Sequence, residues 1–145
     1  MKDPAWWPRR IGPSVTAQPA STLDLLPTVL KLAGAPMPEG RVLDGRDLGP
    51  VLFQQETLPP QPFFFYRGET LMAVRLRKWK LHYRTQAGYG GPPQVTHEPP
   101  ILFQLGRDPG ERFDVAAENP EVVAQLKAVT AAHMAAIETP PSLLR

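Results

Sequence analysis

An alternation of apolar and charged residues between positions 70 and 84 is the clearest structural signal in the chain. Its apolar positions are Met72, Val74, Leu76, Trp79, Leu81 and Tyr83. This period of two predicts two half-buried antiparallel strands joined by a tight turn near Arg77 and Lys78. The run from Phe63 to Tyr66 is apolar on both faces, which predicts a more central strand, and Pro100 to Leu105 predicts a fourth strand.

A helical pattern follows these strands. Asn119 is a suitable N-cap, and Pro120 suits the first helical position. The positions that then share one face are Val122, Leu126, Val129, His133 and Ile137. His133 is therefore interpreted as a core-edge residue rather than a ligand. The four strands and this helix predict a small α+β layer in which the helix covers the apolar face of a four-stranded antiparallel sheet.

The first third of the chain predicts shorter elements. A helix is expected from Leu23 to Ala33, begun by Ser21 or Thr22 and ended by Gly34. Its apolar stripe consists of Leu25, Leu26, Val29, Leu30 and Ala33. A second helical stretch is expected from Arg46 to Phe53. The apolar fragment 4–8, with Trp6 and Trp7 between prolines, predicts an edge strand, so we expect unmatched apolar surface in this region.

Composition narrows the class of protein only in part. The 145 residues suit one ordinary domain, and 42% hydrophobic with 21% charged residues is a globular composition. A net charge of +2 identifies no partner. The absence of cysteine excludes disulfides, thiolate zinc sites and a cysteine nucleophile. The chain carries no secretion signal and no apolar run long enough to span a bilayer, so no membrane association is expected and its location is left unassigned.

Four segments together resemble the sulfatase family. They read STLDLLPTVLKLAGAPMPEGRVLDGRDL from residue 21, FFFYRGETLMAVRLRKWKLHY from residue 63, HEPPILFQLGRDPGE from residue 97 and NPE from residue 119. Within that family the likeness is to the arylsulfatase A and N-acetylgalactosamine-6-sulfatase branch. The resemblance implies that residues 1–55 are the remnant of an alkaline-phosphatase-like α/β catalytic domain, namely an edge strand, a helix and a linker. It implies that residues 56–145 are the sulfatase C-terminal domain.

The resemblance also implies what this chain does not contain. Sulfatases use a formylglycine made from the cysteine or serine of a C-x-P-S-R type motif, together with a calcium ion, and the sequence has no such motif. Formylglycine and calcium are therefore expected only in a full-length relative. We expect a C-terminal fragment of a sulfuric ester hydrolase, inactive alone, that acts as scaffold and substrate-pocket rim. Its expected partners are a missing N-terminal sulfatase domain and a sulfated small molecule or glycan; full-length relatives are typically exported or lysosomal.

One residue is a candidate for contact with that substrate. A Gly- and Pro-rich loop is predicted from Ala87 to Pro99, and the family resemblance implies that its His97 leans toward the mouth of the substrate pocket. The alternative is an exposed loop histidine with no role. Asp44 and Asp47 are carboxylates beside a glycine, but their spacing favours a turn and a helix cap over a metal site.

The charge pattern of the predicted hairpin allows a second function, anion binding. Six Lys or Arg residues and a single acid, Glu69, lie between Arg67 and Arg84. Lys80 and Arg84 are candidates for binding anions, which would suit a non-catalytic module for sulfated glycans. The alternative is that this face of the hairpin is only solvated. Because no aromatic residue alternates on that face, a nucleic acid is not an expected partner.

Overall fold

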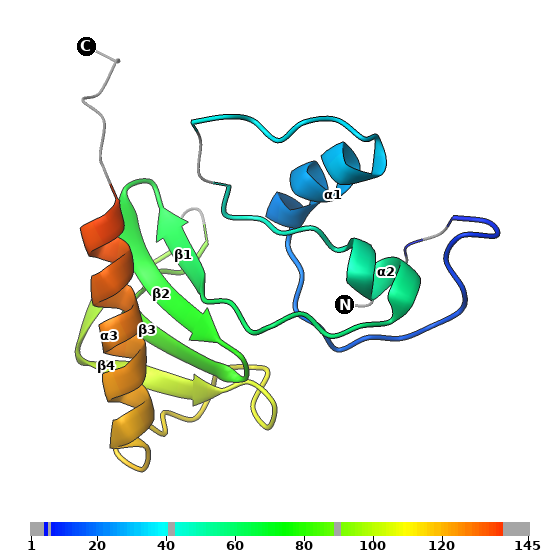
Figure 1. Cartoon of the computed structure of the whole chain (residues 1–145). Coiled ribbons are helices and arrows are strands. Elements are labelled where there is room, and N and C mark those ends of the chain that lie inside the picture. Colours follow the sequence, from blue (N-terminus) through cyan, green and yellow to red (C-terminus); the bar gives the residue numbers. More distant parts are fainter. Residues whose placement is uncertain (1–4, 6, 41–42, 89–90, 138–145) are drawn as a thin grey trace. The chain divides into compact units, whose positions relative to one another are not determined.

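The computed structural model describes residues 5, 7–40, 43–88 and 91–137 (Figure 1). The chain divides into two compact units, Met1–Pro59 and Pro60–Arg145, although its length alone suggested one domain. The first unit contains helices α1, Leu25–Leu32, and α2, Gly49–Gln54. The second contains a four-stranded sheet and helix α3, Pro120–Ala136.

The sheet is an antiparallel meander in the order β1-β2-β3-β4. Its strands are β1, Phe63–Arg67, β2, Thr70–Leu76, β3, Trp79–Thr85, and β4, Val95–Gln104. Helix α3 lies across one face (Figure 1). Val74 pairs with Leu81, and Leu81 pairs with Leu102, so these three side chains form one row beneath Leu126 of α3. The predicted four-stranded sheet with a C-terminal helix is confirmed.

The prediction that Phe63 to Tyr66 is a central strand was wrong, because β1 is an edge strand. Its apolar residues are explained by cover on both faces. Phe64 stacks on His133 of α3 with ring centroids 3.5 Å apart, while Lys80 lies over the Phe65 ring on the other face. His133 also contacts the Tyr66 hydroxyl at 2.9 Å, so its interpretation as a core-edge residue is confirmed.

Two connections are fixed by side-chain hydrogen bonds. In the turn before residue 112, Glu111 adopts a positive φ of 53°. Asp108 fixes this turn by accepting hydrogen bonds from the backbone N–H groups of Arg112 and Phe113. Asn119 is the N-cap residue of α3, but its side chain donates to the Val115 carbonyl and does not cap the helix.

In the first unit, a buried carboxylate joins the start of α1 to a distant loop. Asp24 closes a capping box with Ser21 and also accepts a hydrogen bond from the backbone N–H of Arg46 at 2.8 Å. The Thr28 hydroxyl donates to the Asp24 carbonyl and accepts from the N–H of Leu48. We call these contacts the Asp24 clamp; they hold the LDGRDL segment, residues 43–48, to the start of α1.

Most of the apolar stripe of α1 is exposed, although Leu30 is half-buried. Its members Leu25, Leu26 and Val29 are between 51% and 58% exposed, and Leu32 on the same helix is 46% exposed. Gly34, at φ 66°, ends the helix as predicted. The expectation of unmatched apolar surface in this third of the chain is confirmed.

The remainder of this unit departs from the expected edge strand. Among the described residues of the segment, Pro8 begins a turn and Trp7 packs edge-on against Phe53 of α2. Trp6, the other tryptophan of the predicted strand, lies outside the described residues, as does the tail from Thr139.

Candidate functional site

The segment that carries His97 is a strand with an irregularity, not the predicted loop. Strand β4 begins at Val95, and its register against β3 shifts between His82 and Arg84. Arg84 pairs with Thr96 and His82 pairs with Ile101, so residues 97–100 of β4 face a single β3 residue. Two of those four residues are prolines, which lack the N–H needed for regular pairing. We call residues 97–100 the HEPP bulge.

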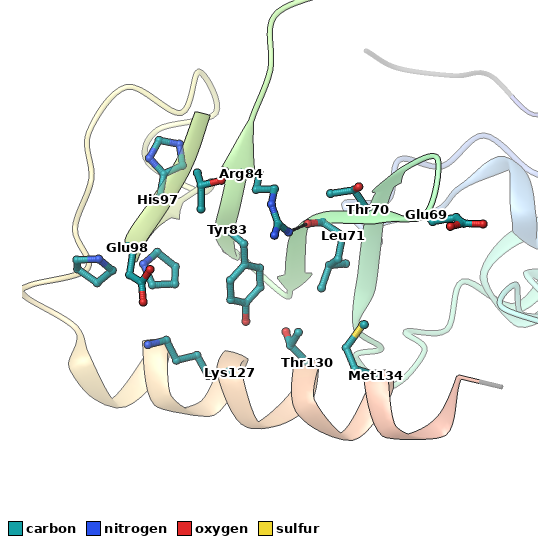
Figure 2. Close-up of a pocket in the computed structure, with 13 residues that line it drawn as sticks. Glu69, Thr70, Leu71, Tyr83, Arg84, His97, Glu98, Lys127, Thr130 and Met134 are labelled. Carbon is teal, nitrogen blue, oxygen red and sulfur yellow. Dashed lines mark hydrogen bonds between the residues drawn. The ribbon is translucent and has the colours of Figure 1, made fainter. Parts of the chain in front are cut away.

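The HEPP bulge lies beside a pocket of about 840 Å³ between the sheet and α3. Charged groups at its border are Glu69, Arg84, His97, Glu98 and Lys127. Apolar walls come from Leu71, Tyr83, Pro100 and Met134. Figure 2 shows Tyr83 pointing from the sheet toward α3, between Lys127 and Thr130. A largely apolar cavity with a few polar groups at its border is the usual form of a small-molecule site.

The floor of this pocket holds a buried phenol. Burial raises the pKa of the Tyr83 hydroxyl above its ordinary value of 10.0, and the neighbouring Thr130 offsets part of the rise. Thr130 itself donates to the Leu126 carbonyl at 2.9 Å, which fixes its side chain on α3. Tyr83 is therefore neutral near pH 7 and offers a hydroxyl group, not a charge, to anything in the pocket.

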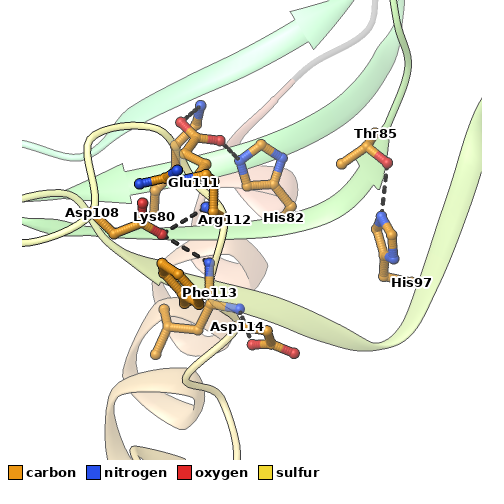
Figure 3. Close-up of polar contacts among 10 residues, drawn as sticks. Lys80, His82, Thr85, His97, Asp108, Glu111, Arg112, Phe113 and Asp114 are labelled. Carbon is orange, nitrogen blue, oxygen red and sulfur yellow. Dashed lines mark hydrogen bonds and ion pairs between the residues drawn. The ribbon is translucent and has the colours of Figure 1, made fainter.

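A polar cluster occupies the opposite face of the sheet. Glu111 lies 2.6 Å from Lys80 Nζ and 2.8 Å from His82 Nε2 (Figure 3). Burial lowers the pKa of His82 below its ordinary value of 6.5, Lys80 lowers it further, and Glu111 opposes both effects. His82 is consequently a neutral ring near pH 7. The cluster is partly enclosed, since the side chains of Lys80 and His82 are only 15% and 12% exposed.

Of the residues suggested by the sequence, His97 and Arg84 border the same pocket, whereas Lys80 borders a pocket on the opposite face of the sheet. Lys80 is paired with Glu111, and Arg84 donates to the Leu71 carbonyl at 3.1 Å, so both anion-binding candidates already have partners within the chain. His97 is half-buried, and its Nε2 lies 2.8 Å from the hydroxyl of Thr85 (Figure 3). Their roles in binding stay predictions.

Sequence reasoning missed Thr85 and the α3 side of the pocket. Lys127, Thr130 and Met134 follow one another at spacings of three and four, which places them on one helical face. That spacing was visible in the sequence and could have been used. Thr85 could not have been found in this way, because its contact with His97 depends on the register shift.

The acidic residues considered as metal ligands have structural roles. Asp47 accepts a hydrogen bond from the Gly49 N–H at 2.7 Å and lies 3.8 Å from Lys31 Nζ. Within the described ranges, no three His, Cys, Asp or Glu side chains gather closely enough to hold a metal ion. None of the helices in those ranges has the length and apolar character that a bilayer span requires.

Comparison with known proteins agrees with this fold. Residues 58–145 match the family described as the C-terminal region of aryl-sulfatase. Human arylsulfatase A is 42% identical over 145 aligned positions, which cover 85% of this chain and 28% of that protein. Canine N-acetylgalactosamine-6-sulfatase is 39% identical over 153 positions, covering 90% of this chain and 29% of that protein.

Solved structures give the same result. The PsFucS1 sulfatase from Pseudoalteromonas sp. superposes with a TM-score of 0.69 at 22% identity, covering 77% of this chain and 25% of that one. Ps i-CgsB in complex with k-i-k-neocarrahexaose gives a TM-score of 0.58 at 26% identity, over 87% and 27% of the two chains.

The sheet, the helix and these matches define the C-terminal region of a sulfatase. The chain belongs to the arylsulfatase family. It spans 28% to 32% of the length of the arylsulfatase A proteins and the N-acetylgalactosamine-6-sulfatase that it matches.

Proposed function

We propose that this chain acts as the C-terminal part of a sulfuric ester hydrolase, in which it supplies scaffold and the rim of the substrate pocket. The observation that carries the proposal is the HEPP bulge, which sets His97 beside the pocket and ties its ring to Thr85. Bulges next to active sites commonly re-aim a side chain toward a ligand. In this proposal the His97 ring donates a hydrogen bond to an oxygen of a sulfated substrate.

The reactive centre is assigned to another part of a full-length sulfatase. The chain has no cysteine and no C-x-P-S-R type motif from which formylglycine could be made, and among its described residues no three His, Cys, Asp or Glu side chains gather closely enough to hold a metal ion. In this proposal the described residues of the chain contribute binding and positioning. We also assign residues 1–55 to the end of the catalytic α/β domain and residues 56–145 to the C-terminal domain; the mostly exposed stripe of α1 supports the first assignment.

The proposal is tested on the purified 145-residue chain with 4-nitrophenyl sulfate. No turnover is expected, and hydrolysis above that of a heat-inactivated control would overturn the assignment of the reactive centre to another part. In a parallel NMR titration, the same ester should shift the signals of His97 but not those of His82 on the opposite face of the sheet. A titration that leaves His97 unmoved would reject its role at the rim.

The alternative function is a non-catalytic module that binds sulfated glycans or other anions. A pocket of about 580 Å³ on the sheet face opposite α3 is bordered by Arg67, Lys80 and Arg84, which favours this alternative. It predicts salt-sensitive retention on heparin that falls when Lys80 and Arg84 are both changed to Ala. Lys31→Ala, in the other unit, is the control with no expected effect. Elution in the flow-through at low salt would reject the module.

A further inference from the structure

Thr85 and His97 form a polar pair at the end of the β3 and β4 pairing. The Thr85 Oγ1 atom lies 2.8 Å from His97 Nε2, and both residues are half-buried (Figure 3). Thr85 pairs with Val95, and Arg84 pairs with Thr96, so the backbone of this segment is held by the sheet. As a β-branched residue on a strand, Thr85 has little freedom at χ1. The hydroxyl is consequently a fixed partner for the ring.

Thr85 is the hydrogen-bond partner of one ring nitrogen of His97, Nε2. A hydroxyl group can donate one hydrogen bond and can also accept. When the His97 ring is neutral, the 2.8 Å contact fits two arrangements: Thr85 O–H donates to Nε2 and the ring proton sits on Nδ1, or Nε2–H donates to Thr85 Oγ1. When the ring is protonated, both ring nitrogens carry a proton. In the first arrangement the Nδ1–H group is a donor in both protonation states.

We propose that Thr85 is a positioning residue that holds His97 as an Nδ1–H donor for the sulfate oxygen of a substrate. The inference rests on the proposed function, because it assigns the atom of His97 that meets the ligand. It adds a specific chemical property, since histidine side chains in water favour the proton on Nε2. In this proposal the HEPP bulge sets the position of the His97 ring, and the Thr85 hydroxyl selects the tautomer of that ring.

The tautomer of His97 can be measured directly in the ¹⁵N-labelled chain by long-range ¹H–¹⁵N NMR at about pH 8.5, where an ordinary histidine is neutral. The Nδ1–H form should predominate in the wild type. Thr85→Val, which removes the hydroxyl at nearly constant volume, should shift the ring toward Nε2–H, and Thr85→Ser should restore Nδ1–H. Unchanged amide signals of Val74 and Leu81 serve as the check that the sheet is intact. A wild-type ring mainly in the Nε2–H form, or one indifferent to Thr85→Val, would overturn the inference.

Adding 4-nitrophenyl sulfate separates this inference from the function on which it rests. In the wild type the ester should shift Nδ1 of His97, and Thr85→Val should weaken its binding about fivefold, as expected for the loss of one hydrogen bond. If the tautomer responds to Thr85 but the ester leaves His97 unmoved, the role of Thr85 in orienting the ring stands and the assignment to a sulfated substrate fails.

Discussion

The Asp24 clamp provides a sharp test of how the first unit is held together. Asp24 is 6% exposed and accepts hydrogen bonds from the backbone N–H groups of Ser21 at 2.7 Å and Arg46 at 2.8 Å. In Asp24→Asn, one carboxylate oxygen becomes an NH₂ group of nearly the same size. That NH₂ group would face the backbone N–H of either Ser21 or Arg46. Because both groups are donors, one of the two hydrogen bonds would be lost.

The size of the effect follows from the lost bond. A hydrogen bond to a charged group contributes about 1.5–3 kcal/mol, so the loss of one should weaken the clamp by about 2 kcal/mol. If the Arg46 or Ser21 amide exchanges with solvent only when the clamp opens, its hydrogen exchange should become about 30-fold faster. Exchange is measured by NMR on the whole chain, because its rates report on each unit separately.

Glu39→Gln is the matched control for this experiment. It makes the same change from acid to amide in the same unit, at an exposed position. Its effect on the exchange of Ser21 and Arg46 should be negligible. Exchange rates of both amides in Asp24→Asn that lie within about twofold of the wild type would show that the clamp does not hold the loop to α1.

Three further results are expected. Leu126→Ala, at a residue 1% exposed, should destabilise the second unit by about 3 kcal/mol in urea denaturation followed by circular dichroism, whereas Met134→Ala at an exposed position should cost less than about 1 kcal/mol. Because the folded-state pKa of His82 is lowered, the unfolded chain takes up the proton first as pH falls through 6.5; stability should therefore decline with acidity, and less so in His82→Gln. Gly45→Ala would place a Cβ 2.0 Å from the Leu23 carbonyl oxygen, so the first unit should lose about 2 kcal/mol, seen as faster amide exchange in α1. Unchanged urea midpoints, an acid slope identical in His82→Gln, or unchanged exchange in Gly45→Ala would each contradict the corresponding argument.

The regular part of the second unit could be predicted from the sequence because its signals are local. Alternation between residues 70 and 84 defined two strands, and the turn near Arg77 lies where it was expected, with Arg77 at φ 55°. The row of Val74, Leu81 and Leu102 faces α3, as the apolar positions required. Period two and period 3.6 report which face of an element is buried, and they agree with the packing at Val74, Leu81 and Leu126; Met72 is an exception, because β1 and β2 shift register beside it and it lines the pocket on the face opposite α3.

The position of β1 could not be predicted in this way. A run that is apolar on both parities indicates cover on both faces, but it does not say whether another strand lies alongside. Phe64 is covered by His133, and Phe65 is covered by Lys80, whose ammonium group is 4.6 Å from the ring centroid. An aromatic edge strand covered from above and below gives the same sequence pattern as a central strand.

The second face of the sheet differed from expectation for a similar reason. Lys80 and His82 occupy the polar parity of β3, which favoured a solvated surface. The turn ending at Glu111 folds over that face and supplies a carboxylate to both residues. Contacts of this kind depend on residues about 30 positions apart, and alternation within one strand carries no information about them.

The site itself depends on register, which is the least local property of a sheet. A regular continuation of the pairing of His82 with Ile101 would place Thr85 opposite Glu98, since each step along one strand is matched by one step along the other. The HEPP bulge shifts that pairing by three residues, so Val95 lies opposite Thr85 and the His97 ring reaches its hydroxyl. Prolines in the sequence indicated irregularity, but not its extent.

The two units are stabilised by different physical terms, and this difference supports the assignment of the first unit to a larger domain. The second unit has a core of four side chains that are almost completely buried, led by Leu81, Leu102 and Val74 at 0% exposure. Within the described residues of the first unit, Leu25, Leu26 and Val29 of its apolar helix stripe stay more than half exposed, and hydrogen bonds around Asp24 join the helix to the following loop. Burying a Leu or Val side chain contributes about 1.5–3 kcal/mol, so cover for that stripe would contribute more than the clamp provides. A helix built with such a face, joined to a well-packed C-terminal domain, is what we expect where a sulfatase catalytic domain passes into its C-terminal region.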